Sequence, residues 1–142
     1  MSQTSDFTAA LRGRRALTAK VGMDAHWRGV MLVSAALRDA GMEVVYLGHA
    51  QASEIAQAAL EEGADLVGLS CLSGNHVSEC RGVIEALRAL DLGECRVVVG
   101  GSIPPGDATL LEELGVAACF GSGISLASIC SEIGRLFEET PG

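Results

Sequence analysis

The sequence predicts an α/β protein with a doubly wound parallel sheet of five strands. Five short apolar runs alternate along the chain with five segments of helical periodicity. Each run has four or five mostly apolar residues without polar alternation, as is typical of strands buried on both faces. The chain has 142 residues, and no internal repeat or linker divides it. We therefore expect one domain around a single core.

The predicted strands are the five apolar runs themselves. In chain order they read L-T-A-K-V, E-V-V-Y-L, L-V-G-L-S, R-V-V-V-G and A-A-C-F. They occupy residues 17–21, 43–47, 66–70, 96–100 and 117–120.

The predicted helices follow the strands one by one. In the first, Val30, Val33 and Leu37 lie on one face, and Gly41 follows as a stop. The second begins near a serine, and glycines also follow the ends of the second, third and fourth helices. The five helices are expected at residues 30–40, 53–62, 77–90, 107–114 and 125–138.

Five consecutive strand–helix units imply a parallel sheet with right-handed crossovers. The expected strand order is 2-1-3-4-5, which is the flavodoxin-like (Rossmann-like) arrangement. In such sheets ligands bind beyond the carboxyl ends of the strands, near the switch between strands 1 and 3. A binding site is therefore expected in the loops after strands 1, 3, 4 and 5.

Composition excludes several classes of function. The net charge of −8 argues against a nucleic-acid surface, which needs a basic stripe. No apolar run approaches the ~18 residues of a membrane helix, and residues 1–15 lack the apolar core of a secretory signal. We expect residues 1–15 to be a short, partly disordered leader, residues 16–142 to form the domain, and the protein to be cytoplasmic. The five cysteines include no C-x-x-C pair, so neither a disulfide framework nor a zinc site is indicated.

The four loops of interest are rich in glycine and small polar residues, which let a large ligand approach the backbone. The segment after strand 2, G-H-A-Q-A-S, has less glycine and is expected at the sheet edge. No P-loop or G-x-G-x-x-G motif is present, and a receiver domain would need an acceptor Asp where strand 3 ends in Leu69 and Ser70. The loops read G-M-D-A-H-W-R-G, S-C-L-S-G-N-H, G-G-S-I-P-P-G and F-G-S-G-I.

The loop after strand 1 places Asp24 two residues before His26. One interpretation is that the carboxylate accepts a ring N–H, which fixes the tautomer and makes the other nitrogen a better metal ligand. The other is an Asp that caps the next helix beside an exposed His. A zinc site would need further ligands, for which only His76 is a candidate. A metal that takes a single protein ligand fits better, because a macrocycle supplies the others.

Three motifs, each after a predicted strand, resemble the cobalamin-binding domain of B12-dependent mutases. They are D-x-H-x-x-G, S-x-L and G-G, and the resemblance extends from about residue 19 to about residue 137. The matching residues are Asp24, His26, Gly29, Ser70, Leu72, Gly100 and Gly101.

The resemblance implies a role for each motif. His26 would be the lower axial ligand of cobalt in place of the dimethylbenzimidazole base, and Asp24 would hydrogen-bond to it. The displaced nucleotide tail of adenosylcobalamin would occupy a slot beside the sheet. The residues expected to bind the cofactor are Met23, Asp24, Ala25, His26, Trp27, Arg28, Gly29, Ser70, Cys71, Leu72, Gly74, Gly100, Gly101, Ser102, Ile103, Phe120, Gly121 and Ile124.

The resemblance also implies a two-component enzyme. These mutases bind substrate in a (β/α)8 barrel of ~250 residues, which this chain has no room to form. We expect the small subunit of an adenosylcobalamin-dependent mutase, which is inactive alone and catalyses a radical 1,2-rearrangement with a large barrel subunit. The favoured substrate is an acyl-CoA of the methylmalonyl-CoA or isobutyryl-CoA type. The alternatives are the small subunit of glutamate (methylaspartate) mutase and a non-catalytic corrinoid carrier or sensor.

Overall fold

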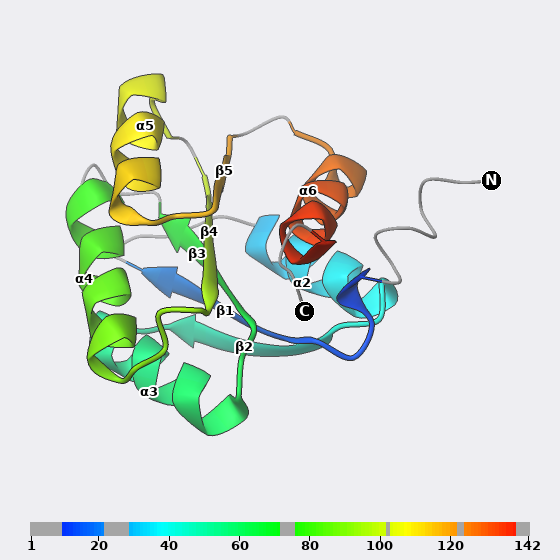
Figure 1. Ribbon diagram of the computed structural model, residues 1–142. Helices are drawn as coiled ribbons and strands as arrows, with labels where there is room; N and C mark the ends of the chain where they lie inside the picture. The colour runs from blue at the N-terminus through cyan, green and yellow to red at the C-terminus, as the bar shows by residue number, and fades with distance from the viewer. Residues whose placement is uncertain (1–9, 22–28, 72–75, 102, 122–123, 139–142) are drawn as a thin grey trace.

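The computed structural model confirms the predicted fold class (Figure 1). It describes residues 10–21, 29–71, 76–101, 103–121 and 124–138. A five-stranded sheet has the order β2-β1-β3-β4-β5, and every neighbouring pair is parallel. The order changes direction between β1 and β3, as the sequence predicted.

The elements alternate along the chain as expected. The strands are β1 (Arg15–Val21), β2 (Glu43–His49), β3 (Leu66–Cys71), β4 (Arg96–Gly100) and β5 (Ala118–Phe120). The helices are α2 (Gly29–Asp39), α3 (Ala52–Glu62), α4 (His76–Ala89), α5 (Pro105–Leu114) and α6 (Leu126–Glu138).

Two element ends differ from the prediction in an informative way. Strand β2 runs to His49, two residues further than expected. Helix α5 begins at Pro105, two residues earlier than expected, with Pro104 as its N-cap. Proline suits the first helical position because the N–H it lacks has no helical partner there.

Helices cover both faces of the sheet and create two core clusters. Helices α3, α4 and α5 pack on one face, where Ile55, Val83 and Leu111 are buried. Helices α2 and α6 pack on the other face, where Val33 and Ile133 are buried (Figure 1). Buried strands between two helical layers explain why the apolar runs show no polar alternation.

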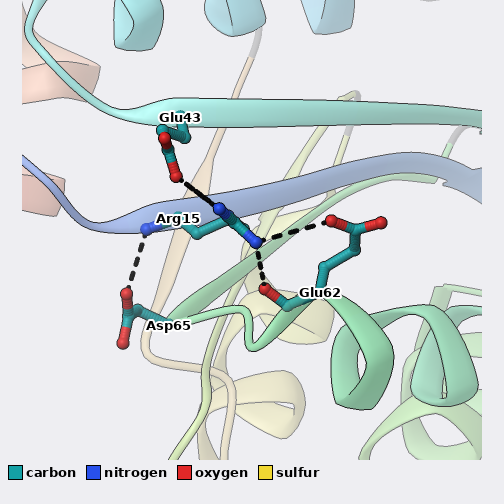
Figure 2. Close-up of polar contacts among 4 residues, drawn as sticks. All are labelled: Arg15, Glu43, Glu62 and Asp65. Atoms are coloured by element: carbon teal, nitrogen blue, oxygen red, sulfur yellow. Dashed lines mark hydrogen bonds and ion pairs between the residues drawn. The ribbon is translucent and has the colours of Figure 1, made fainter.

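An ion-pair network joins the amino ends of β1 and β2 to the end of α3 (Figure 2). The guanidinium of Arg15 donates to the Glu43 carboxylate at 2.6 Å and to the backbone carbonyl of Glu62 at 2.8 Å. The backbone N–H of Arg15 donates to the Asp65 carboxylate at 2.9 Å. The network lies at the sheet end opposite to the loops in which a ligand was expected.

Residues 10–15 lie within the stretch that the sequence analysis describes as a leader. Leu11 is nevertheless fully buried in the cluster under α2 and α6. The guanidinium carbon of Arg14 lies 4.3 Å from the ring centroid of Phe137 in α6, and the Gly13 N–H donates to the carbonyl of Gly41. Burial of the Leu11 side chain favours this packing, because it removes about as much apolar surface from water as the burial of any core leucine. This segment therefore packs with the domain.

Candidate functional site

A narrow apolar slot lies between the sheet and the helices α2 and α6. Its volume is about 20 Å³, which is room for one water molecule. Its strand residues come mainly from β3 and β4, with one from β1 and one from β5, so it lies beside the switch in strand order between β1 and β3. Its lining consists of Thr18, Val30, Val33, Gly68, Leu69, Val98, Val99, Gly100, Phe120, Ile129 and Ile133.

Two glycines leave space on the side of the slot that the sheet forms. Gly68 lies in the middle of β3, opposite Thr18 of β1 and Val98 of β4. A Cβ atom at Gly68 would lie 3.4 Å from Cγ2 of Thr18 and 3.8 Å from Cγ2 of Val98, which is ordinary contact. The position therefore tolerates a methyl group sterically, but any side chain would occupy the slot. Gly100, the last residue of β4, leaves the same space open one row further along.

Ser70 brings an unsatisfied polar atom to this face of the sheet. It follows Gly68 by two residues in β3, so both project toward α2 and α6. Its side chain is fully buried, and no hydrogen-bond partner for its Oγ is found among the described residues. Buried hydroxyls are seldom left unpaired, since each lost hydrogen bond costs about 1–3 kcal/mol. An unpartnered buried hydroxyl beside a glycine floor indicates a site for a ligand with a polar atom.

The other buried hydroxyls of this layer are satisfied. Thr18 Oγ1 and Ser34 Oγ are 2.9 Å apart, and the Ser34 hydroxyl donates to the carbonyl of Val30 at 2.7 Å. These bonds join β1 to the first turns of α2. The contrast singles out Ser70 as the buried hydroxyl of this layer that has no partner among the described residues.

The structure places the predicted site residues in different surroundings. Gly100 and Phe120 line the slot. Gly101 follows β4 with a φ of 134°, and its N–H donates to the carbonyl of Phe120 at 3.1 Å. Ile103 packs against the core cluster of the opposite face, so it is separated from the slot by the sheet.

The remaining described candidates lie at the ends of elements. Gly29 is the first residue of α2, and Cys71 is the last residue of β3. Gly121 is exposed after β5, and Ile124 is 39% exposed. Ile124 lines an open groove of about 650 Å³ between α5 and α6, along the free edge of β5. The other candidates fall outside the described residues; they are Met23, Asp24, Ala25, His26, Trp27, Arg28, Leu72, Gly74 and Ser102.

The sequence analysis predicts few of the residues that line the slot, because it places the site in the loops after the strands. The walls are formed within elements, by apolar residues such as Val30 and Val33 of α2 and Ile129 and Ile133 of α6. One available signal was Gly68, because an isolated glycine inside a strand often marks a close approach by a ligand or another backbone. The helix residues carry no such signal, since core and slot positions have the same apolar spacing.

Two of the described cysteine thiols, those of Cys95 and Cys130, are poor nucleophiles. Burial, followed by the charge of Asp65, raises the pKa of the Cys95 thiol to about 11. Burial and then the charge of Asp39 raise the pKa of the Cys130 thiol. Both thiols are therefore protonated at neutral pH, and the thiolate is the reactive form of cysteine. Among the described residues, no group of three or more His, Cys, Asp and Glu side chains is arranged to hold a metal ion.

Comparison with known proteins gives consistent results. A family model described as the B12 binding domain matches residues 14–129. The chain is 41% identical over 122 residues to the pivalyl-CoA mutase small subunit of Xanthobacter autotrophicus, covering 85% of this chain and 82% of that protein. It is 42% identical over 103 residues to the 2-hydroxyisobutanoyl-CoA mutase small subunit of Aquincola tertiaricarbonis, covering 72% and 76%.

Longer relatives and solved structures complete the comparison. The methylmalonyl-CoA mutase of Escherichia coli is 34% identical over 142 residues, which cover 98% of this chain but only 20% of that protein. A cobalamin-binding protein from Desulfitobacterium hafniense has a similar structure, with a TM-score of 0.73, 22% identity and coverage of 89% and 59%. The NarL receiver domain of Mycobacterium tuberculosis follows with a TM-score of 0.70, 15% identity and coverage of 91% and 99%. At these identities the two structures show the fold alone. Within the part of the chain that the structure describes, no helix is long and apolar enough to cross a membrane.

Proposed function

Since the chain belongs to the family of B12-binding domains, we propose that it is the cobalamin-binding small subunit of an adenosylcobalamin-dependent acyl-CoA mutase. The observation that carries this proposal is its similarity to two mutase small subunits over more than three quarters of their own length. In the methylmalonyl-CoA mutase of Escherichia coli the matching region is only a fifth of a longer chain. The names of the two small subunits favour an acyl-CoA over glutamate as the substrate.

The residues of the slot fit the nucleotide tail of a cobalamin. Gly68 and Gly100 leave room above the sheet, and the Ser70 hydroxyl is buried without a partner among the described residues. The apolar walls suit an aromatic base, and Ser70 suits a polar atom of the tail. The slot holds only about 20 Å³, so binding requires α2 and α6 to lie further from the sheet than they do here.

The chain's own residues then have three tasks. His26 would be the protein ligand of cobalt, and Asp24 would fix the tautomer of its imidazole by accepting the other ring N–H. The slot residues hold the displaced tail, so that the nucleotide base cannot compete with His26 for the metal. Adenosylcobalamin, when bound, supplies homolysis of its cobalt–carbon bond and so starts a radical rearrangement.

Substrate binding belongs, in this proposal, to a large subunit with a (β/α)8 barrel. The small subunit presents the cofactor at the carboxyl end of its sheet, which is the end where ligands of doubly wound folds bind. The large subunit closes over this end and supplies the acid and base groups of the rearrangement.

Electron paramagnetic resonance tests the proposed cobalt ligand. We expect cob(II)alamin bound to protein with nitrogen-15 histidine to show one coupled protein nitrogen. His26→Ala should remove this coupling, whereas the matched variant His76→Ala should keep it. Asp24→Asn should keep the coupling but weaken binding about 10–100-fold, as is usual for a residue that orients a ligand. Coupling only to the dimethylbenzimidazole nitrogen in the wild-type protein would exclude His26 as the ligand.

A further inference from the structure

One row of residues crosses the whole sheet at its carboxyl end. Lys20 of β1 is in register with His49 of β2 on one side and with Ser70 of β3 on the other. Ser70 is in register with Gly100 of β4, which is in register with Phe120 of β5. In-register residues of neighbouring parallel strands project from the same face. The row therefore lies on the α2 and α6 face, one step beyond Thr18 and Gly68.

His49 reaches this face only because β2 contains a bulge. Thr18 is in register with Tyr46, but the next residue, Ala19, is in register with Gly48, so Leu47 is an extra residue. Without that insertion His49 would project toward α3, because a shift of one residue turns every later side chain to the other face. Gly48 has a φ of 78°, a conformation that glycine adopts without strain. Bulges of this kind often re-aim a side chain beside a functional site.

The row changes in character from one edge of the sheet to the other. At the β2 edge are the exposed His49 and Lys20, which is half-buried and is the only lysine of a chain with net charge −8. In the middle is the fully buried Ser70, whose Oγ lacks a partner among the described residues. At the β5 edge Gly100 and Phe120 line the apolar slot. The row thus offers an imidazole and an ammonium group, then a hydroxyl, then an apolar cavity.

This order matches a ligand with an anionic end and an aromatic end. The nucleotide tail of cobalamin has one phosphodiester, followed by a ribose and an apolar base. Strands lie about 4.8 Å apart, so the Cα atoms of His49 and Ser70, which are two strands apart, are separated by about 10 Å. A tail that extends along the row contacts them with different groups.

We propose that His49 binds the phosphodiester of the cobalamin nucleotide tail, beside Lys20, while the base enters the slot under β3 and β4. The inference rests on the proposed function, because the tail is displaced into the slot only if the protein binds cobalamin without its base on cobalt. The sequence pattern predicts no binding residue in or after β2, and this inference adds β2 to the elements that hold the cofactor.

Binding of cobalamin and of cobinamide, which has the corrin but neither phosphodiester, ribose nor base, tests the proposal. Dissociation constants come from visible absorption titrations of the full chain. We expect His49→Ala to weaken cobalamin binding about tenfold, as for a lost hydrogen bond to a charged group, and to leave cobinamide binding unchanged. His49→Gln, which keeps a donor, should lose less. Arg81→Ala removes a cation from an exposed position on α4, in the opposite layer, and should change neither constant.

The outcomes separate this inference from the proposed function. Equal cobalamin affinity in wild type and His49→Ala overturns the role of His49 and leaves the cofactor assignment intact. Equal weakening of cobalamin and cobinamide places His49 against the corrin and overturns the assignment to the tail. A wild-type chain that binds cobinamide as tightly as cobalamin contradicts both this inference and the displaced tail.

Discussion

At the scale of single residues, the candidate site depends on two glycines, which leave space, and on one small hydroxyl group. Gly68 and Gly100 have no side chains to fill the slot, and the Ser70 hydroxyl is buried without a partner among the described residues. These features lower the stability of the protein when no ligand is bound, since glycine weakens a strand and an unpaired hydroxyl loses its hydration. Such local costs are expected where a ligand supplies the missing contacts.

We expect Gly68→Ala to fold normally and to bind cobalamin about tenfold more weakly. The new methyl group would meet Thr18 and Val98 at ordinary contact distances, so the fold has no reason to fail. It would occupy the slot, and overpacking a tight apolar site typically costs about 1–3 kcal/mol. Titration with cobalamin measures the loss, and thermal unfolding verifies the fold.

Gly82→Ala is the matched control for this change. Gly82 lies in α4 on the opposite layer, where a Cβ atom would meet only Cβ of Ala52 at 3.5 Å. Its cobalamin affinity should equal that of the wild type. If Gly68→Ala also binds with unchanged affinity, the slot is not where the nucleotide tail lies.

At the scale of elements, the segment before β1 contributes to the core although it resembles a leader. Leu11 is fully buried, and Phe137 of α6 is 7% exposed and carries Arg14 over its ring. The segment and the end of α6 therefore cover the same part of the sheet. Because α6 also forms a wall of the slot, anything that loosens this contact should affect the slot indirectly.

We expect Leu11→Ala to lower the free energy of unfolding by about 2–4 kcal/mol, the usual cost of truncating a buried leucine. Leu110→Ala, at a position of α5 that is 47% exposed, should cost less than about 1 kcal/mol. Urea denaturation followed by circular dichroism measures both values. A loss for Leu11→Ala as small as that for Leu110→Ala would mean that the segment does not belong to the cooperative fold.

At the scale of the whole molecule, the described part of the chain is one sheet with its two helical layers. The slot and the row of His49, Lys20 and Ser70 lie on one face and reach the carboxyl end of the sheet. The Arg15 network joins β1, β2 and the end of α3 at the opposite end.

We expect the purified chain with adenosylcobalamin to rearrange no acyl-CoA, because the proposal assigns substrate binding to the large subunit. The assay covers pivalyl-CoA, 2-hydroxyisobutanoyl-CoA, methylmalonyl-CoA and isobutyryl-CoA, with glutamate as the contrasting substrate, and chromatography detects products. Addition of the cognate large subunit should produce turnover of one acyl-CoA, and the two subunits should bind more tightly with cofactor present. Turnover by the chain alone would refute the division of labour.

The sequence by itself determined the fold class, the strand order and the loops in which to search. It could do so because apolar runs, helical spacing and glycine stops are local patterns, and five strand–helix units permit few topologies. The three loop motifs identified the family without any knowledge of side-chain contacts, and the comparisons agree with that identification.

Only the tertiary structure decided which residues line the slot and which face His49 occupies. Val33 and Ile133 have the spacing of ordinary core residues, and they become slot walls only where α2 and α6 face Gly68 across the cavity. The face of His49 depends on one extra residue in β2, and the pairing of strands 20 or more residues apart is not encoded in any local pattern. Leu11 was missed for the same reason, because the cluster in which it is buried includes Ile133 and Phe137 of α6, at the far end of the chain.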